Sequence, residues 1–340
     1  MKKNNYLIPQ NNFIFIFVMM VLSLIYFLYI PRYVPAYFTQ DSFTVKNAML
    51  DPGSFEQSYR NTAAFYKLFG FSYTSVPLSA HFFAWIIFAV WLATLLRINR
   101  QKSFSMYEGA FIGFVALMYG IEYTTLTKDL LLILFMVVIV NVYIRHRSMF
   151  VLAVATLIYA YFFRTYWYMV ASWAAILGLQ KNPKIRKGLT LLLLFSLAVI
   201  VVYNLSTGGQ ITTQRVDVNA TRDSTAAASM LNNVIPNSNI FTDIVNWIYT
   251  MGTLIVPLQG LGSPNVIVYY IWIWAVIAFC IKHRQQIDSK TMLLLVGFVA
   301  VQAMFEPDLG SALRHQLPWC PLLYFLLEMN EKPKQGDPPA

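Results

Sequence analysis

Long apolar runs, separated by short polar breaks, recur along almost the whole chain. The runs are roughly 15–20 residues long, the length at which an α-helix crosses the hydrocarbon core of a bilayer. In lipid the backbone groups must be paired within the spanning segment, which helices achieve. The pattern therefore predicts an all-α, polytopic integral membrane protein that forms a single membrane domain over residues 1–340.

We place ten membrane-spanning helices in these runs. They are expected at residues 13–30, 79–96, 106–121, 129–144, 149–163, 166–179, 189–203, 265–281, 290–305 and 316–328. The first run lacks a clear small-residue cleavage site and is followed by "PRYVP". We therefore interpret it as a retained helix and not as a signal peptide.

Two long loops interrupt the predicted helices, at about residues 31–78 and 204–264. Loops of this length are usually functional or disordered, and the aromatic residues of the first loop favour order. The second loop begins polar and turns apolar in "DIVNWIYTMGTLIVPLQGLG". Because another crossing would reverse the sidedness of all later segments, we interpret this stretch as an interfacial or re-entrant helix that ends near Pro257 and Gly260.

Composition and charge agree with membrane insertion. The chain is 58% hydrophobic and 12% charged, with a mean hydropathy of +0.54, whereas about a quarter of a soluble domain is charged. Sixteen of the 25 Lys and Arg residues fall in short segments that share one side if the N-terminus is inside. The positive-inside rule then predicts cytoplasmic termini and places the two long loops on the opposite, outer side of the membrane. The net charge of +10 reflects this topology, and no basic stripe with interleaved aromatics indicates nucleic-acid binding.

The stretch "FVLAVATLIYAYFFRTYWYMVASWAAILGL" is interpreted as two helices with Arg164 at the tip between them. This hairpin keeps the basic segments "RHR" and "QKNPKIRK" on the same side. The two cysteines, Cys280 and Cys320, fall near opposite ends of their helices, so we expect no disulfide. Metal-binding Cys/His spacing is absent from the sequence, and we predict no metal and no cofactor.

The unusual polar residues gather on the predicted outer side, in "EYTTLTKD", "FRTYW" and "EPDLGSALRHQ". Charges at such helix ends are costly, which favours a functional role. Arginine binds phosphate oxygens bidentately, while acids and histidine transfer protons. We predict catalytic roles for Arg164, Glu306, Asp308, Arg314 and His315. We predict substrate-binding roles for Asp41, Arg60, Glu122, Lys128, Arg215 and Arg222.

Each of these residues also has a structural interpretation. Arg164 could extend to lipid phosphates, and Lys128 with Asp129 could simply start a helix, with Asp129 as its cap. Glu306 and Asp308 could cap a turn. The combination is more informative, because a lipid-linked diphosphate donor needs both parts: cations neutralise the departing diphosphate, and a base activates the attacking hydroxyl.

Three stretches resemble the Wzy-type O-antigen and capsule repeat-unit polymerases of bacterial inner membranes. "TLTKDLLLILF" resembles the family's charged entry into an apolar helix, with Lys128. "YFFRTYWYM" resembles its arginine-aromatic hairpin, and "GSALRHQLPWCPLL" resembles its late arginine-proline stretch. The long penultimate outer loop, with Arg215 and Arg222, also fits this family, although the repeated arginine-glycine loop motifs of some members are not evident.

The resemblance implies a metal-independent glycosyltransferase that works on the periplasmic face. Such enzymes transfer a growing glycan from its undecaprenyl diphosphate onto the sugar end of a new lipid-linked repeat unit. The implied partners are the undecaprenyl-diphosphate-linked glycan and membrane lipid, with a polysaccharide chain-length regulator as a further candidate.

Other functions stay open. A polyprenyl-linked sugar glycosyltransferase or an O-antigen ligase would make Asp41 central. A flippase or transporter, which is not an enzyme, would be expected to carry polar groups near mid-membrane, whereas the predicted spans are nearly free of charge. A membrane O-acyltransferase is a third option, but the early arginine-and-histidine helix pattern expected of one is not seen.

Overall fold

The structure, a computed structural model, describes residues 10–29, 32–33, 40–98, 106–146, 148–181, 183–220, 229–259, 261–262, 264–282 and 288–323. These residues form helices and their connections, and no β-strand occurs among them. An isolated antiparallel bridge joins Met230 and Asp308. The prediction of an all-α chain is therefore confirmed for the described residues.

The chain divides into two compact units. The first comprises Met1–Arg147, Leu157–Thr165 and Leu317–Met329, and the second comprises Ser148–Thr156, Tyr166–Gln316 and Asn330–Ala340. Helix α7 (Met149–Phe162) contributes residues to both units. The single membrane domain stays a prediction.

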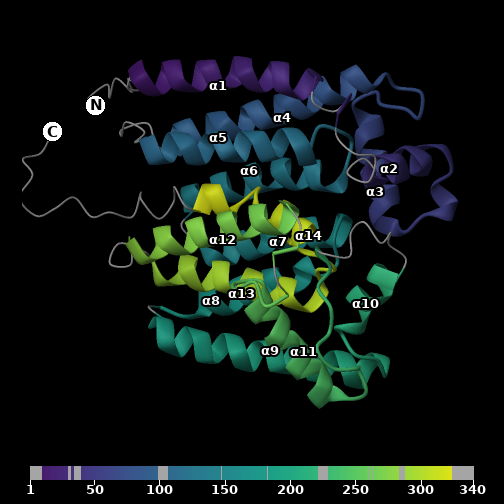
Figure 1. The fold of residues 1–340 in the computed structure, drawn as a ribbon, viewed down its shortest axis with the longest axis vertical. Coiled ribbons are helices and arrows are strands. Elements are labelled where there is room, and N and C mark those ends of the chain that lie inside the picture. Colours follow the sequence, from purple (N-terminus) through teal and green to yellow (C-terminus); the bar gives the residue numbers. More distant parts are fainter. Residues whose placement is uncertain are drawn as a thin grey trace, which may run out of the picture. The chain divides into compact units, whose positions relative to one another are not determined.

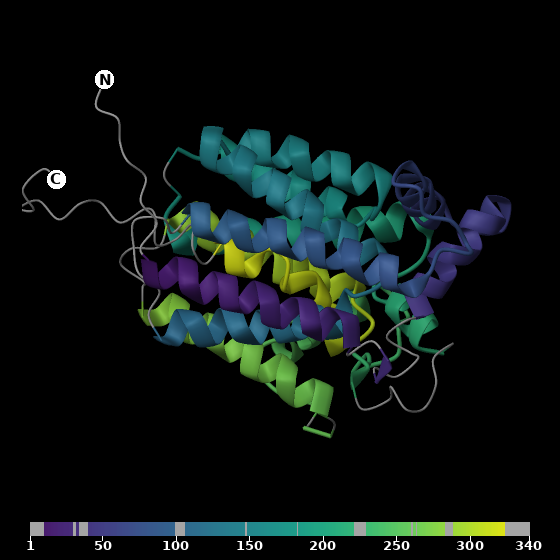
Figure 2. The same ribbon diagram turned by 90° about the horizontal axis from the view of Figure 1, so that it is seen from above.

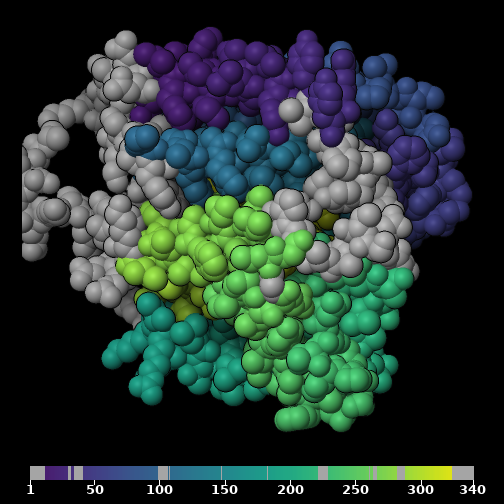
Figure 3. All heavy atoms as spheres, in the orientation of Figure 1, coloured from purple at the N-terminus to yellow at the C-terminus, as the bar shows by residue number. Residues whose placement is uncertain are grey.

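Four long helices build the first unit: α1 (Gln10–Tyr29), α4 (Pro77–Ile98), α5 (Met106–Glu122) and α6 (Lys128–His146). Helix α1 packs against α4 and α5, and α4 packs against α6 (Figures 1 and 2). The outward side of α1 is apolar, with Phe13, Phe17 and Leu22 each more than half exposed, and α1 forms part of the surface in Figure 3. Apolar side chains on the outside of a bundle fit lipid as the surrounding solvent.

The predicted first loop is largely helical in its described part. It holds α2 (Gln40–Leu50), the 3₁₀ turn η3 (Pro52–Ser54) and α3 (Gln57–Leu68). Asp51 caps η3 by accepting a hydrogen bond from the backbone nitrogen of Gly53. Tyr66 on α3 is fully buried and donates a hydrogen bond of 2.8 Å to the carbonyl of Thr127. This contact holds α3 against the start of α6.

Helix α13 (Ser289–Phe305) lies at the centre of the second unit. It packs against α8 (Trp167–Leu179), α9 (Ile185–Thr207) and α11 (Ile240–Thr253). Trp173 of α8 donates a 2.8 Å hydrogen bond to the carbonyl of Leu293. A Cβ at Gly297 would lie 2.2 Å from the Trp173 ring, so the close approach of α8 and α13 requires glycine there.

The remaining helices of the second unit are α10 (Thr213–Ala220), α12 (Pro264–Lys282) and α14 (Leu309–Gln316). Helix α12 packs against α14. The segment between the spans predicted at 290–305 and 316–328 was expected to be a short turn, but Leu309–Gln316 forms helix α14. The next segment, predicted as a span at 316–328, is described only as far as residue 323.

Helices overlap each predicted span from 13–30 to 290–305, and the predicted break at Arg164 lies between α7 and α8. Among the described residues, four helices are long and apolar enough to cross a membrane: Asn12–Tyr29, Pro77–Ile98, Lys128–His146 and Ile185–Thr207. Met149–Phe162, Trp167–Leu179, Val266–Ile281 and Ser289–Phe305 are shorter apolar helices. These helices fit a membrane-embedded protein, while the count of ten spans and the orientation stay predictions.

Candidate functional site

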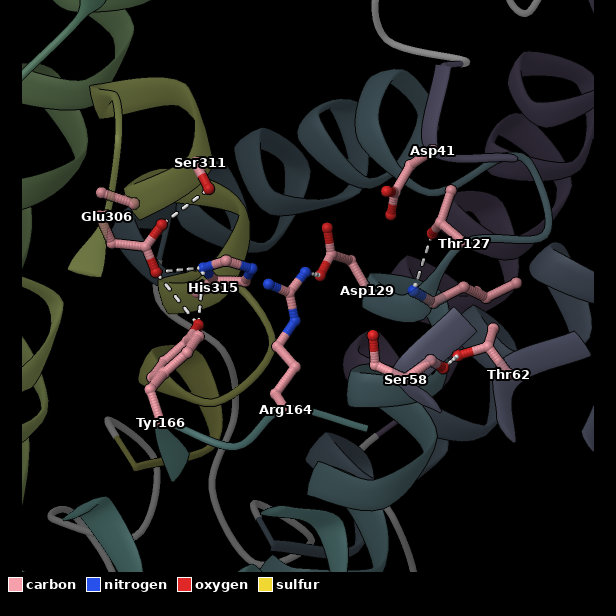
Figure 4. Close-up of polar contacts among 12 residues, drawn as sticks. Asp41, Ser58, Thr62, Thr127, Asp129, Arg164, Tyr166, Glu306, Ser311 and His315 are labelled. Carbon is pink, nitrogen blue, oxygen red and sulfur yellow. Dashed lines mark hydrogen bonds and ion pairs between the residues drawn. The ribbon is translucent and has the colours of Figure 1, made fainter. Parts of the chain in front are cut away.

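A group of charged and aromatic side chains in the first unit joins residues far apart in the chain. We call Asp41, Tyr59, Lys128, Asp129 and Arg164 the Lys128–Arg164 group. Tyr59 donates a 2.5 Å hydrogen bond to Oδ1 of Asp41. Nζ of Lys128 lies 3.5 Å from the centroid of the Tyr59 ring, a cation–π contact. Arg164 forms an ion pair with Asp129, and the two side chains point toward one another in Figure 4.

The first turns of three helices position this group. Asp41 lies in the first turn of α2, Tyr59 near the start of α3, and Lys128 and Asp129 open α6. Thr127 caps α6, because its Oγ1 accepts a 3.1 Å hydrogen bond from the backbone nitrogen of Leu130. The cap predicted at Asp129 is therefore supplied by Thr127, and the Asp129 carboxylate is paired with Arg164.

Two members of the Lys128–Arg164 group are almost completely buried. Lys128 is 9% exposed and Asp129 is 1% exposed. Burial raises the pKa of the Tyr59 phenol, and the neighbouring Asp41 carboxylate raises it further, while Arg164 opposes this shift. Tyr59 therefore stays protonated and remains a donor to Asp41. With two acids and two cations, the group can offer a carboxylate for proton transfer and cations for an anionic ligand.

A second group, in the second unit, is built around Glu306 and His315. Nδ1 of His315 lies 2.5 Å from Oε1 of Glu306. Tyr166 donates a 3.1 Å hydrogen bond to the same oxygen, and Ser311 donates a 2.7 Å hydrogen bond to Oε2. We call these four residues the Glu306–His315 group, and Figure 4 shows three of them converging on the glutamate carboxylate.

Local sequence explains how the end of α13 meets α14. Glu306 is the C-cap of α13, and Pro307 follows it, which disfavours continuation of the helix. Asp308 then starts α14, because its Oδ1 accepts a 2.8 Å hydrogen bond from the backbone nitrogen of Ser311. Gln302 donates a 3.0 Å hydrogen bond to the carbonyl of Ala312, which holds α14 against α13. His315 lies one helical turn after Ser311, and the packing of α14 against α13 places its side chain in contact with Glu306.

The Glu306–His315 group has the arrangement of an oriented base. Glu306 and His315 are 2% and 1% exposed. A carboxylate at Nδ1 fixes the imidazole tautomer in which Nε2 accepts a proton, and it stabilises the imidazolium that results. Tyr166 and Ser311 hold the carboxylate itself. This arrangement can remove a proton from a hydroxyl.

The other predicted site residues lie in varied surroundings. Arg314 is half-buried on α14 beside His315, and Asp308 is 7% exposed and caps that helix. Arg60 is exposed on α3, and Glu122 is buried at the end of α5. Arg222 lies outside the described residues.

Arg215 on α10 is fully buried and cross-links three segments of the second unit. Its Nε donates to Oδ1 of Asn233 at 3.1 Å, its Nη1 to the carbonyl of Ala303 at 2.6 Å, and its Nη2 to the carbonyl of Asn246 at 3.3 Å. Burial lowers the pKa of Arg215 to about 10, and Asp243 opposes this shift. These contacts favour a structural role over the substrate binding predicted from the sequence.

Three members of the two groups were missed by sequence reasoning: Tyr59, Tyr166 and Ser311. Tyr166 lies two residues after Arg164, inside the arginine-aromatic stretch that had been singled out, so its position was the available signal. Within the described part of the chain, no group of three or more His, Cys, Asp or Glu residues could hold a metal ion. In comparisons with known proteins, no family model, no curated protein and no solved structure matches this chain.

Proposed function

We propose that this protein is a membrane glycosyltransferase that polymerises lipid-linked oligosaccharide repeat units. The donor is a glycan on undecaprenyl diphosphate, and the acceptor is a sugar hydroxyl of a second lipid-linked unit. The observation that supports this proposal most is the buried Glu306–His315 pair, held by Tyr166 and Ser311. Glycan transfer needs a base for the acceptor hydroxyl, and an oriented imidazole is suited to that step.

In the transfer, Nε2 of His315 takes the proton of the acceptor hydroxyl as its oxygen attacks the anomeric carbon of the donor sugar. The bond from that carbon to the diphosphate oxygen breaks, and the lipid diphosphate leaves with the electron pair. Glu306 stabilises the positive charge that develops on the imidazole. The base is thus restored when the imidazolium loses its proton to solvent.

The Lys128–Arg164 group has the chemistry to hold the diphosphate. The Arg164 guanidinium can bind phosphate oxygens through two parallel hydrogen bonds, with Lys128 as a second positive charge. Asp129 holds Arg164 in this structure, so binding of a diphosphate would replace a carboxylate by phosphate oxygens. We place the reaction on the periplasmic face of a bacterial inner membrane with both termini cytoplasmic, and a chain-length regulator is a candidate partner.

A second function of the same chemical class is favoured by one contact. The hydrogen bond from Tyr59 to Asp41 places a carboxylate beside Lys128, in the first loop. If Asp41 is the base, the protein is a polyprenyl-linked sugar glycosyltransferase or a ligase, and the Glu306–His315 group is structural. The two functions therefore differ in which carboxylate-containing group is needed for transfer.

The test is complementation of a deletion strain with chromosomal-level expression of single variants, followed by analysis of the surface glycan. His315→Gln is expected to abolish long polymer while single repeat units accumulate, at normal protein abundance. His146→Gln is the matched control, because His146 is an exposed histidine at the far end of α6. Full polymer length in His315→Gln, with polymer lost in Asp41→Asn, would replace the first function by the second.

A further inference from the structure

We infer that α11 is a re-entrant half-helix, which enters the bilayer from the side where α13 ends and stops inside it with its apolar face against lipid acyl chains. This inference is independent of the proposed reaction. It concerns the interaction surface made by α11 and the described residues that follow it, 254–259 and 261. Two neighbouring helices show how deep the helix reaches.

Helix α13 provides the first measure of depth. Trp247, in the middle of α11, donates a 3.0 Å hydrogen bond to the carbonyl of Ala300. Ala300 lies five residues before Phe305, the last residue of α13. At 1.5 Å per residue this is about 7.5 Å inside the end of α13. The middle of α11 therefore lies alongside the interior of α13, about 7.5 Å from the C-terminal end of α13.

Helix α12 provides the second measure. Only residues 283–288 separate α12 from α13, so α12 begins on the side where α13 ends. The partners of the end of α11 are Tyr269, Tyr270 and Trp274, which lie five, six and ten residues after Pro264 at the start of α12. These positions are about 7 to 15 Å along a helix of about 28 Å. The C-terminal end of α11 thus lies alongside the interior of α12.

The carbonyl of the last residue of α11 and those of the three residues after it are paired with these aromatic donors. Tyr270 donates to the carbonyls of Thr253 at 2.5 Å and Val256 at 3.1 Å, Tyr269 to that of Leu254 at 2.9 Å, and Trp274 to that of Ile255 at 2.9 Å. The last carbonyls of a helix have no partner within it. Water satisfies them at a surface, but in hydrocarbon an unpaired carbonyl is strongly unfavourable. Three aromatic donors at one helix end, with the Tyr270 hydroxyl shared between two carbonyls, are what a helix that stops within lipid needs.

The two faces of α11 are reversed relative to a helix on a water-soluble protein. Its buried residues are Asp243, Asn246, Trp247, Thr250 and Thr253, of which four are polar. The Asp243 carboxylate accepts hydrogen bonds from the backbone nitrogens of Ile211 and Thr212 at 2.9 and 3.0 Å. The outward side carries Phe241 and Ile248, which are 71% and 55% exposed. A surface helix in water buries its apolar face, so the reverse arrangement indicates contact with lipid.

The surfaces next to α11 are also apolar, which favours lipid acyl chains as the contact of its outward face. Helix α9, a candidate membrane span, packs against α11 and also exposes apolar side chains, including Leu194 and Val202. Beyond the end of α11, Val256, Leu258 and Leu261 are each about half exposed. An apolar surface that continues from a predicted span onto α11 and the following turn fits acyl chains along its whole length.

Depth measurement by spin labelling tests the inference. In a background with Cys280→Ala and Cys320→Ala, single cysteines at Ile255 and Ile248 are labelled and the full chain is reconstituted in phospholipid vesicles. Labels at Leu194, near the middle of α9, and at Leu205, near its end, serve as deep and shallow references. The ratio of oxygen to nickel-chelate collision at Ile255 is expected to match that at Leu194 and to exceed that at Leu205.

Two outcomes overturn the inference. A ratio at Ile255 no higher than at Leu205 means that α11 lies on the surface. Spin–spin broadening at Ile248 that disappears on dilution with unlabelled protein means that a second copy, and not lipid, covers this face.

A substitution pair tests the pairing of the carbonyls separately. Tyr270→Phe removes a hydroxyl that two carbonyls near the end of α11 share, and Trp274→Phe removes the donor to one carbonyl. Both are expected to lower the unfolding temperature in vesicles, the first by more. Tyr168→Phe is the control, since Tyr168 is 37% exposed and its hydroxyl bonds to no described residue. Unfolding temperatures equal to that of Tyr168→Phe mean that water satisfies these carbonyls and that α11 does not end in lipid. If Tyr270→Phe does not fold, the single bond lost in Trp274→Phe gives the same comparison.

Discussion

Nδ1 of His315 and Oε1 of Glu306 are 2.5 Å apart, although the two residues are nine positions apart in the chain and a proline follows the glutamate. The contact forms because α13 ends at Phe305 and α14 starts three residues after Glu306. A glutamate that orients one histidine should have little effect of its own once the histidine is removed. The pair therefore makes a quantitative prediction about combined substitutions.

We expect His315→Gln to lower the rate of glycan transfer by about 10²–10⁴-fold, the usual contribution of a general base. Glu306→Gln is expected to cause a smaller loss, because glutamine still accepts from Tyr166 but cannot stabilise an imidazolium. The double variant should be no slower than His315→Gln alone. The measurement is the initial rate with purified protein and lipid-linked repeat units, and losses that multiply would show that the two residues act independently.

Tyr166 is expected to act as a positioning residue through Glu306. Tyr166→Phe removes one charge-assisted hydrogen bond to the carboxylate, and because such bonds are worth about 1.5–3 kcal/mol, the rate should fall by at most about 10- to 150-fold. The pH at which the rate is half-maximal should shift, since that hydrogen bond favours the ionised glutamate and through it the imidazolium. A pH–rate profile measures this shift, and a Tyr166→Phe profile that overlays the original one would assign Tyr166 to packing alone.

The fold was largely predictable because a bilayer leaves few choices. Lipid forces each long apolar run into a helix, so the segment predicted at 290–305 is found at Ser289–Phe305 and the one at 166–179 is found at Trp167–Leu179. Helix α14 was not predicted, because its eight residues are too polar and too short to give a periodic signal. It depends on the Asp308 cap and on the hydrogen bond from Gln302, which only the folded chain supplies.

The candidate site was predictable only where charge marked it. Lys128, Arg164, Glu306 and His315 drew attention because charged residues at the ends of membrane helices are costly. Tyr59 and Tyr166 gave no such signal in a chain with 21 tyrosines. Arg215 drew attention as an arginine of the long second loop, yet its partners are backbone carbonyls and an asparagine, which no sequence pattern reveals.

Substitutions at Arg164 test whether its role needs the planar guanidinium or only a positive charge. If it binds diphosphate, Arg164→Lys should impair transfer about as strongly as Arg164→Gln, because an ammonium cannot make two parallel hydrogen bonds. Asp129→Asn should change the affinity for the donor more than the maximal rate, since Asp129 competes with phosphate for the same guanidinium. Steady-state kinetics with varied donor separate these effects, and unaltered kinetics in Arg164→Lys would favour attachment of Arg164 to lipid phosphates.

The last prediction compares two arginines of the second unit, Arg215 and Arg314. Arg215 is fully buried, and Arg215→Gln leaves the carbonyls of Ala303 and Asn246 without their donor. Hydrogen bonds from a charged group are worth about 1.5–3 kcal/mol each, so the free energy of unfolding should fall by several kcal/mol. Less protein should accumulate in the membrane, and whatever folds should keep its transfer rate per molecule.

Arg314→Gln is expected to behave in the opposite way. Arg314 is half-buried on α14 beside His315, and a role in transfer predicts normal abundance and unfolding temperature together with lost polymer. Both properties are measured on the same preparations, as the unfolding temperature in detergent and as the rate per folded molecule. Normal stability and lost transfer in Arg215→Gln would return Arg215 to the substrate-binding residues, and full transfer in Arg314→Gln would remove Arg314 from the site.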